Sequence, residues 1–115
     1  MTESNEILNV IWSSGDPEVA PKVCFMYTHN AKRQGWFEEV HMIIWGPSAD
    51  LAARDASIQE GIKAMIADGV IVEACKACAD SYGASEALEA LGVDVKYMGV
   101  PLTDRLKAGW HTLTF

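Results

Sequence analysis

The chain of 115 residues is 50% hydrophobic and 22% charged, the composition of an ordinary soluble protein that is long enough to build one core. A formal net charge of −7 disfavours nucleic acid and anionic membranes as partners, because both are bound through clustered Lys and Arg. No apolar run is long enough to span a bilayer, and the polar start Met1–Glu6 does not resemble a secretory signal. We therefore expect one cytoplasmic domain over residues 1–115, whose three cysteines are thiols rather than disulfides.

Short apolar runs alternate with helical patterns along the whole chain. The apolar and β-branched runs predict strands over residues 7–12, 40–45, 70–74, 93–98 and 110–115. Helices are predicted over residues 16–33, from Pro47 or Ser48 to 66, over 85–92 and over 101–108. This alternation predicts an α/β domain, in which a mostly parallel five-stranded sheet lies between two layers of helices.

Two of the predicted helices carry a recognisable apolar face. In the first helix, this face consists of Val19, Val23, Met26 and Tyr27, and the neighbouring Cys24 is predicted to be a core residue. In the second helix, the apolar stripe consists of Leu51, Ile58, Ile62, Met65 and Ile66. Asp68 and Gly69 are expected to end this second helix.

A Cys-x-x-Cys pair follows the third predicted strand directly. Cys75 is expected at the carboxyl edge of the sheet, where open α/β folds bind ligands, and Cys78 lies three residues later. The pair is expected at the start of a helix that follows the strand directly. The N-terminus of this helix and Lys76 would stabilise a thiolate at Cys75, whereas Asp80 would oppose it. This spacing is used for redox, sulfur-handling and metal sites, and a buried cysteine is also common in cores. Because the chain has no second cysteine pair and no His-x-x-x-His, no metal site is predicted.

Three loops are expected to meet at this edge, because right-handed crossovers place the loops after parallel strands on the same side. Their predicted ligand-binding residues are Ser13, Ser14, Gly15, Trp45, Gly46, Pro47 and Lys76. Each loop also has the composition of an ordinary turn between a strand and a helix. The chain has no glycine-rich phosphate-binding fingerprint, so no cofactor is predicted, although the fold alone leaves flavin open.

Two further features have simpler interpretations. His41 lies inside a predicted strand, where a hydrogen-bonded structural histidine is more common than a ligand. Trp36 and Phe37 lie between a helix and a strand and are candidates for an exposed patch that mediates self-association.

Several of these segments together resemble the DsrE/DsrF-like family of small sulfur-relay proteins. They are the Trp-Gly-Pro-Ser-Ala-Asp-Leu stretch at 45–51, Asp-Gly-Val at 68–70, the strand ending in Cys75, and Tyr-Met-Gly-Val-Pro-Leu-Thr at 97–103. The resemblance covers the chain from about Ile7 to its end. It implies one DsrE/F-like domain with a three-layer α/β/α fold of flavodoxin-like topology, assembled as a homo-oligomer, either a trimer or a hexamer.

The resemblance also implies a chemistry for the cysteines. Several family members carry sulfur as a cysteine persulfide, and the family's acceptor cysteine matches Cys75. Cys78 is an addition relative to the better-studied carriers. We therefore expect a sulfurtransferase-like carrier that accepts sulfane sulfur on Cys75 and passes it to a partner thiol, with Cys78 able to resolve the persulfide. The alternatives are a non-catalytic module that binds a small ligand at the three loops and an interaction subunit of a redox complex.

Overall fold

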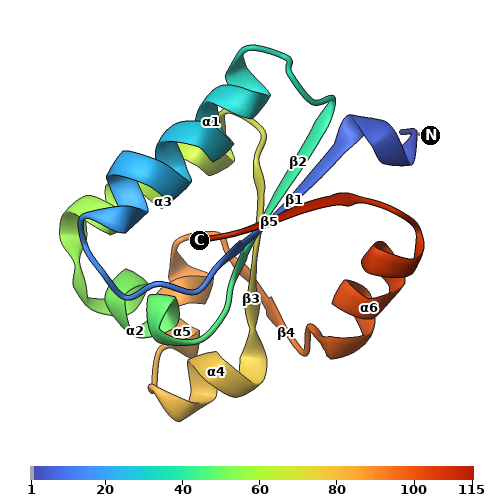
Figure 1. The fold of residues 1–115 in the computed structure, drawn as a ribbon. Coiled ribbons are helices and arrows are strands. Elements are labelled where there is room, and N and C mark those ends of the chain that lie inside the picture. The colour runs from blue at the N-terminus through green and yellow to red at the C-terminus, as the bar shows by residue number, and fades with distance from the viewer. Residues whose placement is uncertain (1) are drawn as a thin grey trace.

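The computed structural model describes residues 2–115, and a five-stranded sheet forms its centre (Figure 1). The strands are β1 (Ile7–Trp12), β2 (Glu39–Ile44), β3 (Ile71–Cys75), β4 (Asp94–Lys96) and β5 (His111–Thr114). They lie in the order β4-β3-β2-β1-β5, and every neighbouring pair is parallel. The predicted five-stranded sheet is therefore confirmed, and it is parallel throughout.

Helices cover both faces of the sheet, as predicted, but unequally. The helical segments are η1 (Ser4–Glu6), η2 (Ala20–Phe25), α1 (Met26–Arg33), α2 (Pro47–Arg54), α3 (Ala56–Ala67), α4 (Lys76–Ser81), α5 (Ser85–Ala90) and α6 (Gly99–Lys107). Figure 1 shows α1, α2, α3 and α5 on one side of the sheet and α6 alone on the other. The second face is therefore covered mainly by α6.

The strand order differs from the 2-1-3-4-5 order of flavodoxin-like sheets, so this part of the predicted topology is corrected. From β1 to β4 each strand is added on the same side of its predecessor, and only β5 lies on the other side of β1. Right-handed crossovers in one direction cover one face, and a crossover in the reverse direction covers the opposite face. The reversal before β5 therefore explains why α6 lies alone.

Alternate residues of the strands divide the interior into two clusters. The large cluster contains Leu8, Val10 and Trp12 of β1 and lies on the side covered by most of the helices. The small cluster, formed by the opposite strand faces, contains Ile43 and Cys75 and is completed by Met98. The face of the sheet that carries Cys75 therefore has a much smaller apolar core than the opposite face.

The first predicted helix is present, but its buried face differs from the apolar face seen in the sequence. It begins as the π-helix η2 and continues as α1. Val23 and Met26 are 46% and 57% exposed. The buried residues are Ala20, Cys24, Phe25, Thr28 and Ala31. Cys24 is thus a core residue, as predicted, whereas Val23 and Met26 face outwards.

The single helix predicted from Pro47 to 66 is two helices, α2 and α3. Asp55 separates them with an extended backbone, and its carboxylate accepts hydrogen bonds from the N–H groups of Ser57 and Ile58. An Asp in this position is an N-cap, which starts a new helix rather than continuing the old one. None of the helices described for residues 2–115 has the length and apolar character needed to cross a membrane.

Candidate functional site

The cysteine pair lies where β3 meets α4. Cys75 is the last residue of β3 and the N-cap of α4. It is only 6% exposed and packs with Ile43 and Met98. Cys78, in the first turn of α4, is partly exposed and packs against the same cluster. The two thiols therefore share one apolar environment, with Cys75 as the more deeply buried member.

The thiols of Cys78 and Cys24 are both less acidic than a free cysteine. Burial raises the pKa of Cys78, the Cys75 thiol raises it further, and a hydrogen bond from the backbone of Gly46 lowers it in part. Burial raises the pKa of Cys24 to about 12 against a small opposing effect of Thr28. Since Cys24 belongs to the large cluster on the other face, it is chemically separate from the pair.

Lys76 is next to Cys75 in the chain, but its charge is engaged elsewhere. Its Nζ atom lies 3.2 Å from Oδ2 of Asp80, one turn along α4. The hydrogen bond to Asp80 raises the pKa of Lys76. Asp80 therefore neutralises much of the field that Lys76 would exert on a thiolate.

The first two predicted loops are in direct contact with each other. The N–H of Ser48 donates to the main-chain oxygen of Ser13 over 3.1 Å. A Cβ atom on Gly15 would lie 3.2 Å from the Cβ of Pro47, so the two backbones pass close together. The structure thus brings the loop after β1 and the loop after β2 together, as their positions in the sheet require.

The second loop also reaches the cysteines. Trp45 packs against the small cluster that contains Cys75. Gly46 has a positive φ of 84°, which favours glycine, and its backbone is the group that hydrogen-bonds Cys78. All three loops therefore form one continuous edge around the thiol pair.

The side chains and the backbone N–H groups of Ser13 and Ser14 already have hydrogen-bond partners. The backbone N–H and the Oγ of Ser13 donate to the main-chain oxygen of Phe115 over 2.7 and 3.1 Å, and the N–H of Ser14 donates to the same oxygen over 3.2 Å. The Oγ of Ser14 accepts from the N–H of Asp16. These donors hold the end of β5 against the loop.

A buried charge network lies on the same face as Cys75. Its centre is Glu73, two residues before Cys75 and 2% exposed. Arg105 of α6 donates to both carboxylate oxygens of Glu73, while Lys96 Nζ lies 3.1 Å from Oε2. His41 lies between two carboxylates, with Nδ1 3.1 Å from Glu73 and Nε2 2.7 Å from Glu39.

These contacts keep Glu73 ionised. Burial raises the pKa of Glu73, but hydrogen bonds from His41, Arg105 and Lys96 outweigh burial and hold it well below its usual range. The sequence patterns do not predict this network of Glu73, Arg105 and Lys96. A lone carboxylate in a strand buried on both faces was the available signal, because such a charge requires partners.

The comparisons with known proteins place this arrangement in a family. The sequence model of the DsrE/DsrF-like family matches residues 9–115, nearly the whole chain. The chain belongs to the DsrE/DsrF-like family. The resemblance predicted from the sequence is therefore confirmed. A comparison with curated proteins gave no match.

Solved structures agree with this DsrE/DsrF-like fold. The conserved protein of unknown function BT1422 from Bacteroides thetaiotaomicron is 34% identical, with a TM-score of 0.93 over 96% of this chain and 95% of that one. The ychN protein from E. coli is 18% identical, with a TM-score of 0.74 over 100% of both chains. MTH1491 from Methanobacterium thermoautotrophicum, also of unknown function, is 20% identical, with a TM-score of 0.72 over 95% and 97%. The last two show likeness of fold alone.

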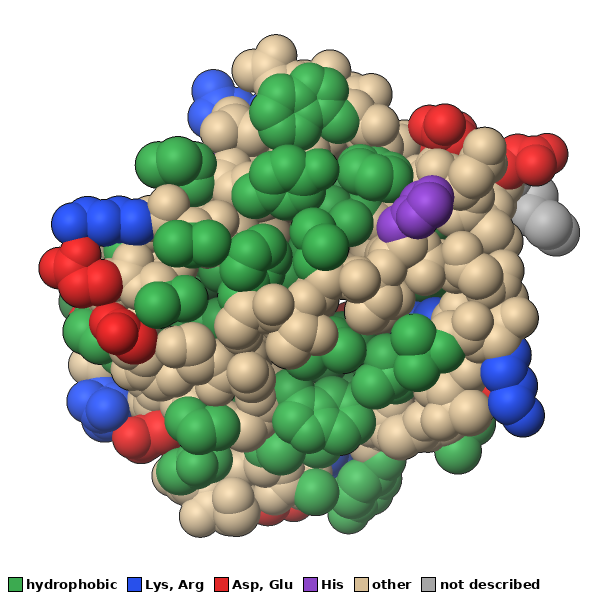
Figure 2. Space-filling view, viewed as in Figure 1, with side chains coloured by type: hydrophobic (Ala, Val, Ile, Leu, Met, Phe, Trp, Pro, Cys, Tyr) green, Lys and Arg blue, Asp and Glu red, His purple; other side chains and the backbone are tan. Residues whose placement is uncertain are grey.

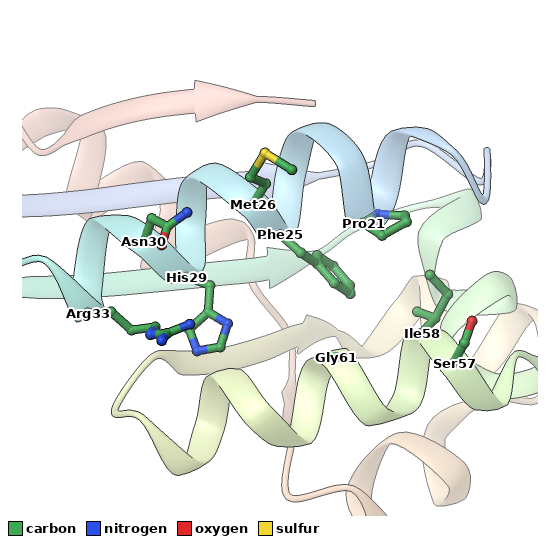
Figure 3. Close-up of a pocket in the computed structure, with 9 residues that line it drawn as sticks. All are labelled: Pro21, Phe25, Met26, His29, Asn30, Arg33, Ser57, Ile58 and Gly61. Atoms are coloured by element: carbon green, nitrogen blue, oxygen red, sulfur yellow. The ribbon is translucent and has the colours of Figure 1, made fainter.

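A surface cavity of this DsrE/DsrF-like chain is lined by neither Cys75 nor Cys78. It measures about 370 Å³. Its lining residues are Pro21, Phe25, Met26, His29, Asn30, Arg33, Ser57, Ile58 and Gly61. Figure 3 shows Phe25 pointing towards Gly61 of α3, with His29 and Arg33 further along α1. None of the predicted ligand-binding residues lines this cavity. Within residues 2–115, no three His, Cys, Asp or Glu side chains gather in a way that would hold a metal ion.

Proposed function

We propose that this protein is a sulfur carrier, which accepts sulfane sulfur as a persulfide on Cys75 and passes it to the thiol of a partner protein. The position of Cys75 carries the proposal: it closes β3 at the carboxyl edge of a parallel sheet, with a second thiol in the next turn. Membership of a sulfur-relay family supports it. The common apolar environment of the two thiols also favours it, because a persulfide formed there is sheltered from water.

The chemistry follows from thiolate substitution. The thiolate of Cys75 attacks the outer sulfur of a polysulfide or persulfide donor, a new S–S bond forms, and the donor leaves as a shorter thiolate. A partner thiolate then attacks the outer sulfur and releases Cys75 as a thiolate. Alternatively, Cys78 attacks the sulfur of Cys75 itself, which forms a Cys75–Cys78 disulfide and releases HS⁻. A dithiol reductant is then required to restore the pair.

Intact-mass measurement tests the proposal directly. The reduced protein is exposed to inorganic polysulfide and compared with Cys75→Ser, Cys78→Ser and Cys24→Ala, each checked for an unchanged circular-dichroism spectrum. We expect mass gains of one sulfur atom or more, reversed by reductant, in the native chain, in Cys78→Ser and in Cys24→Ala. Loss of the gain in Cys75→Ser assigns the acceptor. A native protein that gains no sulfur while its thiols are reduced would falsify the carrier function.

We also propose that the protein works as a homo-oligomer, a trimer or hexamer. One exposed apolar surface supports this assembly, and we call it the α1 patch: Val23, Met26, Tyr27 and Trp36. Trp36 is 55% exposed, and its ring lies 5.8 Å from that of Tyr27. Figure 2 shows hydrophobic side chains gathered widely over the upper half of this face of the molecule. A surface of this kind is typical of interaction sites.

Light scattering after size-exclusion chromatography tests the assembly. We expect a mass of three or six chains for the native protein and a smaller species for Trp36→Glu, with Arg54→Glu on the exposed surface as a control. A native monomer at micromolar concentration would contradict this proposal.

The α1 patch also favours a second candidate function, that of an interaction subunit in a redox complex in which the cysteines take no part. The double variant Cys75→Ser, Cys78→Ser separates the two. If the protein is a sulfur carrier, this variant loses sulfur transfer. If the protein is an interaction subunit, the variant still supports its partner.

A further inference from the structure

Helix α6 and its N-cap Met98 form part of the cover of Cys75, together with Trp45 and Cys78. This helix is the one helix on its side of the sheet in Figure 1. Met98, its N-cap, is fully buried, and Leu102 packs against the small cluster of Ile43, Cys75 and Met98. Cys75 is consequently 6% exposed although it lies at the edge of the sheet. The approach of a sulfur donor to Cys75 is therefore restricted while α6 is in this position.

The apolar attachment of α6 is weak. None of its nine residues is buried, and Val100 and Leu106 are 73% and 53% exposed. A helix with so little buried apolar surface is held mainly by other contacts, and segments of this kind open at low cost in free energy.

The main polar attachment of α6 is Arg105. Its guanidinium donates to both carboxylate oxygens of Glu73 and to Oδ1 of Asn9, and the ring of Trp110 lies 4.9 Å away. The Arg105 side chain is only 11% exposed, so the ion pair is shielded from water and from salt. Glu73 belongs to β3, two residues before Cys75. The contact therefore joins the covering helix to the strand that carries the thiol.

We propose that the Glu73–Arg105 ion pair holds α6 closed over Cys75, and that α6 must open to admit the sulfur donor. Glu73 and Arg105 are then positioning residues for the proposed sulfur transfer, on which this inference rests. In the closed form Cys78 remains partly exposed, whereas Cys75 is covered. Opening is needed most by a bulky donor such as a protein persulfide, and least by small inorganic polysulfide.

Thiol modification measures this opening without any sulfur transfer. The rates at Cys75 and Cys78 are followed by peptide mass spectrometry with iodoacetamide and with a maleimide attached to a polyethylene glycol chain. The variants are Arg105→Gln and Glu73→Gln, and Arg54→Gln, which removes an exposed ion pair with Asp50, is the control. Cys78 serves as an internal reference in every sample.

We expect the reagents to modify Cys75 at least about fivefold faster in Arg105→Gln and in Glu73→Gln than in the native chain. A covered thiol reacts in proportion to the population in which it is uncovered. The increase in rate is expected to be larger with the bulky reagent. The rate at Cys78 in the two variants, and both rates in the Arg54→Gln control, are expected to change little. Hydrogen exchange gives the second measurement: we expect exchange in Arg105→Gln to rise by a larger factor for the amides of α6 than for those of α3, which respond only to the loss of overall stability. Unchanged Cys75 rates, or an equal rise in α6 and α3, would overturn the proposal, since the pair would then act on overall stability.

The two proposals fail in different ways. If polysulfide adds no sulfur to the native chain but Cys75 alkylation depends on Arg105, the cover is real and the carrier function is wrong. If sulfur loads onto Cys75 equally fast in the native chain and in Arg105→Gln, with either small or protein donors, the carrier function stands and the cover does not limit it.

Discussion

Two guanidinium nitrogens of Arg105 lie 2.8 and 2.6 Å from the two carboxylate oxygens of Glu73, in the middle of the less covered face of the sheet. A charge pair in this setting adds little net stability compared with apolar residues, but removing one partner leaves the other buried and uncompensated. We expect Glu73→Gln to lower the free energy of unfolding by about 3–5 kcal/mol, measured by urea denaturation. Asp50→Asn, which removes an exposed pair with Arg54, is the control and is expected to change little. A change below about 1 kcal/mol in Glu73→Gln would show that the pair is easily replaced by a neutral contact.

The same carboxylate predicts a pH dependence. The pKa of Glu73 is lowered on folding, so the unfolded chain takes up the proton first as the pH falls. The stabilisation is fully present above the unfolded value near 4.3 and is lost progressively below it. We expect the native chain to lose stability more steeply than Glu73→Gln between about pH 5 and pH 2. Parallel curves for the two chains would contradict the lowered pKa.

Cys78 is expected to be a slow nucleophile at neutral pH. Burial and the Cys75 thiol raise its pKa, so its thiolate fraction at pH 7 is smaller than that of a free thiol. Because Cys75 contributes to this rise, Cys75→Ser is expected to lower the pKa of Cys78 and to speed its alkylation by iodoacetamide at pH 7. Cys24, whose pKa is about 12, is the internal control and is expected to stay unmodified until the protein unfolds. A slower Cys78 in Cys75→Ser would mean that Cys75 assists it instead.

Gly61 and Gly99 form a matched pair for testing the packing of α3 and α6. A Cβ on Gly61 would lie 2.9 Å from the ring of Phe25, which is itself packed edge-on against Trp12. Overpacking costs about 1–3 kcal/mol, more than the gain of about 1 kcal/mol from replacing a helical glycine by alanine. Gly61→Ala is therefore expected to lower the melting temperature.

Gly99 has nothing within 4 Å of the same position and no positive φ. Gly99→Ala is expected to stabilise the protein by about 0.4–1 kcal/mol, because it restricts the unfolded chain. Calorimetry of both variants checks the contrast, and two shifts of the same sign would refute it.

The strands of the sheet and the residues at its carboxyl edge could be predicted from the sequence because they depend on local signals. Each buried strand is a short apolar run, and the right-handed crossover rule then places Cys75 beside the Trp45 loop without further information. The position of β5 beside β1 could not be predicted from the sequence, because strand order depends on which face of the sheet each crossover covers. The break at Asp55 was readable in principle, since an Asp followed by Ser57 is a good helix start.

Burial in the first helix and at the cysteines needed the three-dimensional structure. The apolar face of Val23 and Met26 has regular spacing, yet the smaller residues Cys24 and Ala31 face the core. Spacing alone does not say which face packs when a π-helix shifts the register. Likewise, the sequence places Cys75 at a ligand-binding edge but does not show that Met98 covers it. That contact joins two segments that are remote in the chain.

The reversal of strand order has a consequence for the way the protein is made. Pairing of β1 with β5 joins Leu8 to His111, so it spans nearly the whole chain, whereas the contacts among β1, β2 and β3 are closer in sequence. Long-range pairings carry the greater loop-closure cost and slow folding. We expect α6 and β5 to be the last elements to dock on a chain that emerges from the ribosome. Until they do, the small cluster lacks Met98 and Leu102, and both thiols of the pair face the surrounding solution. The newly made chain is therefore the species most open to adventitious oxidation.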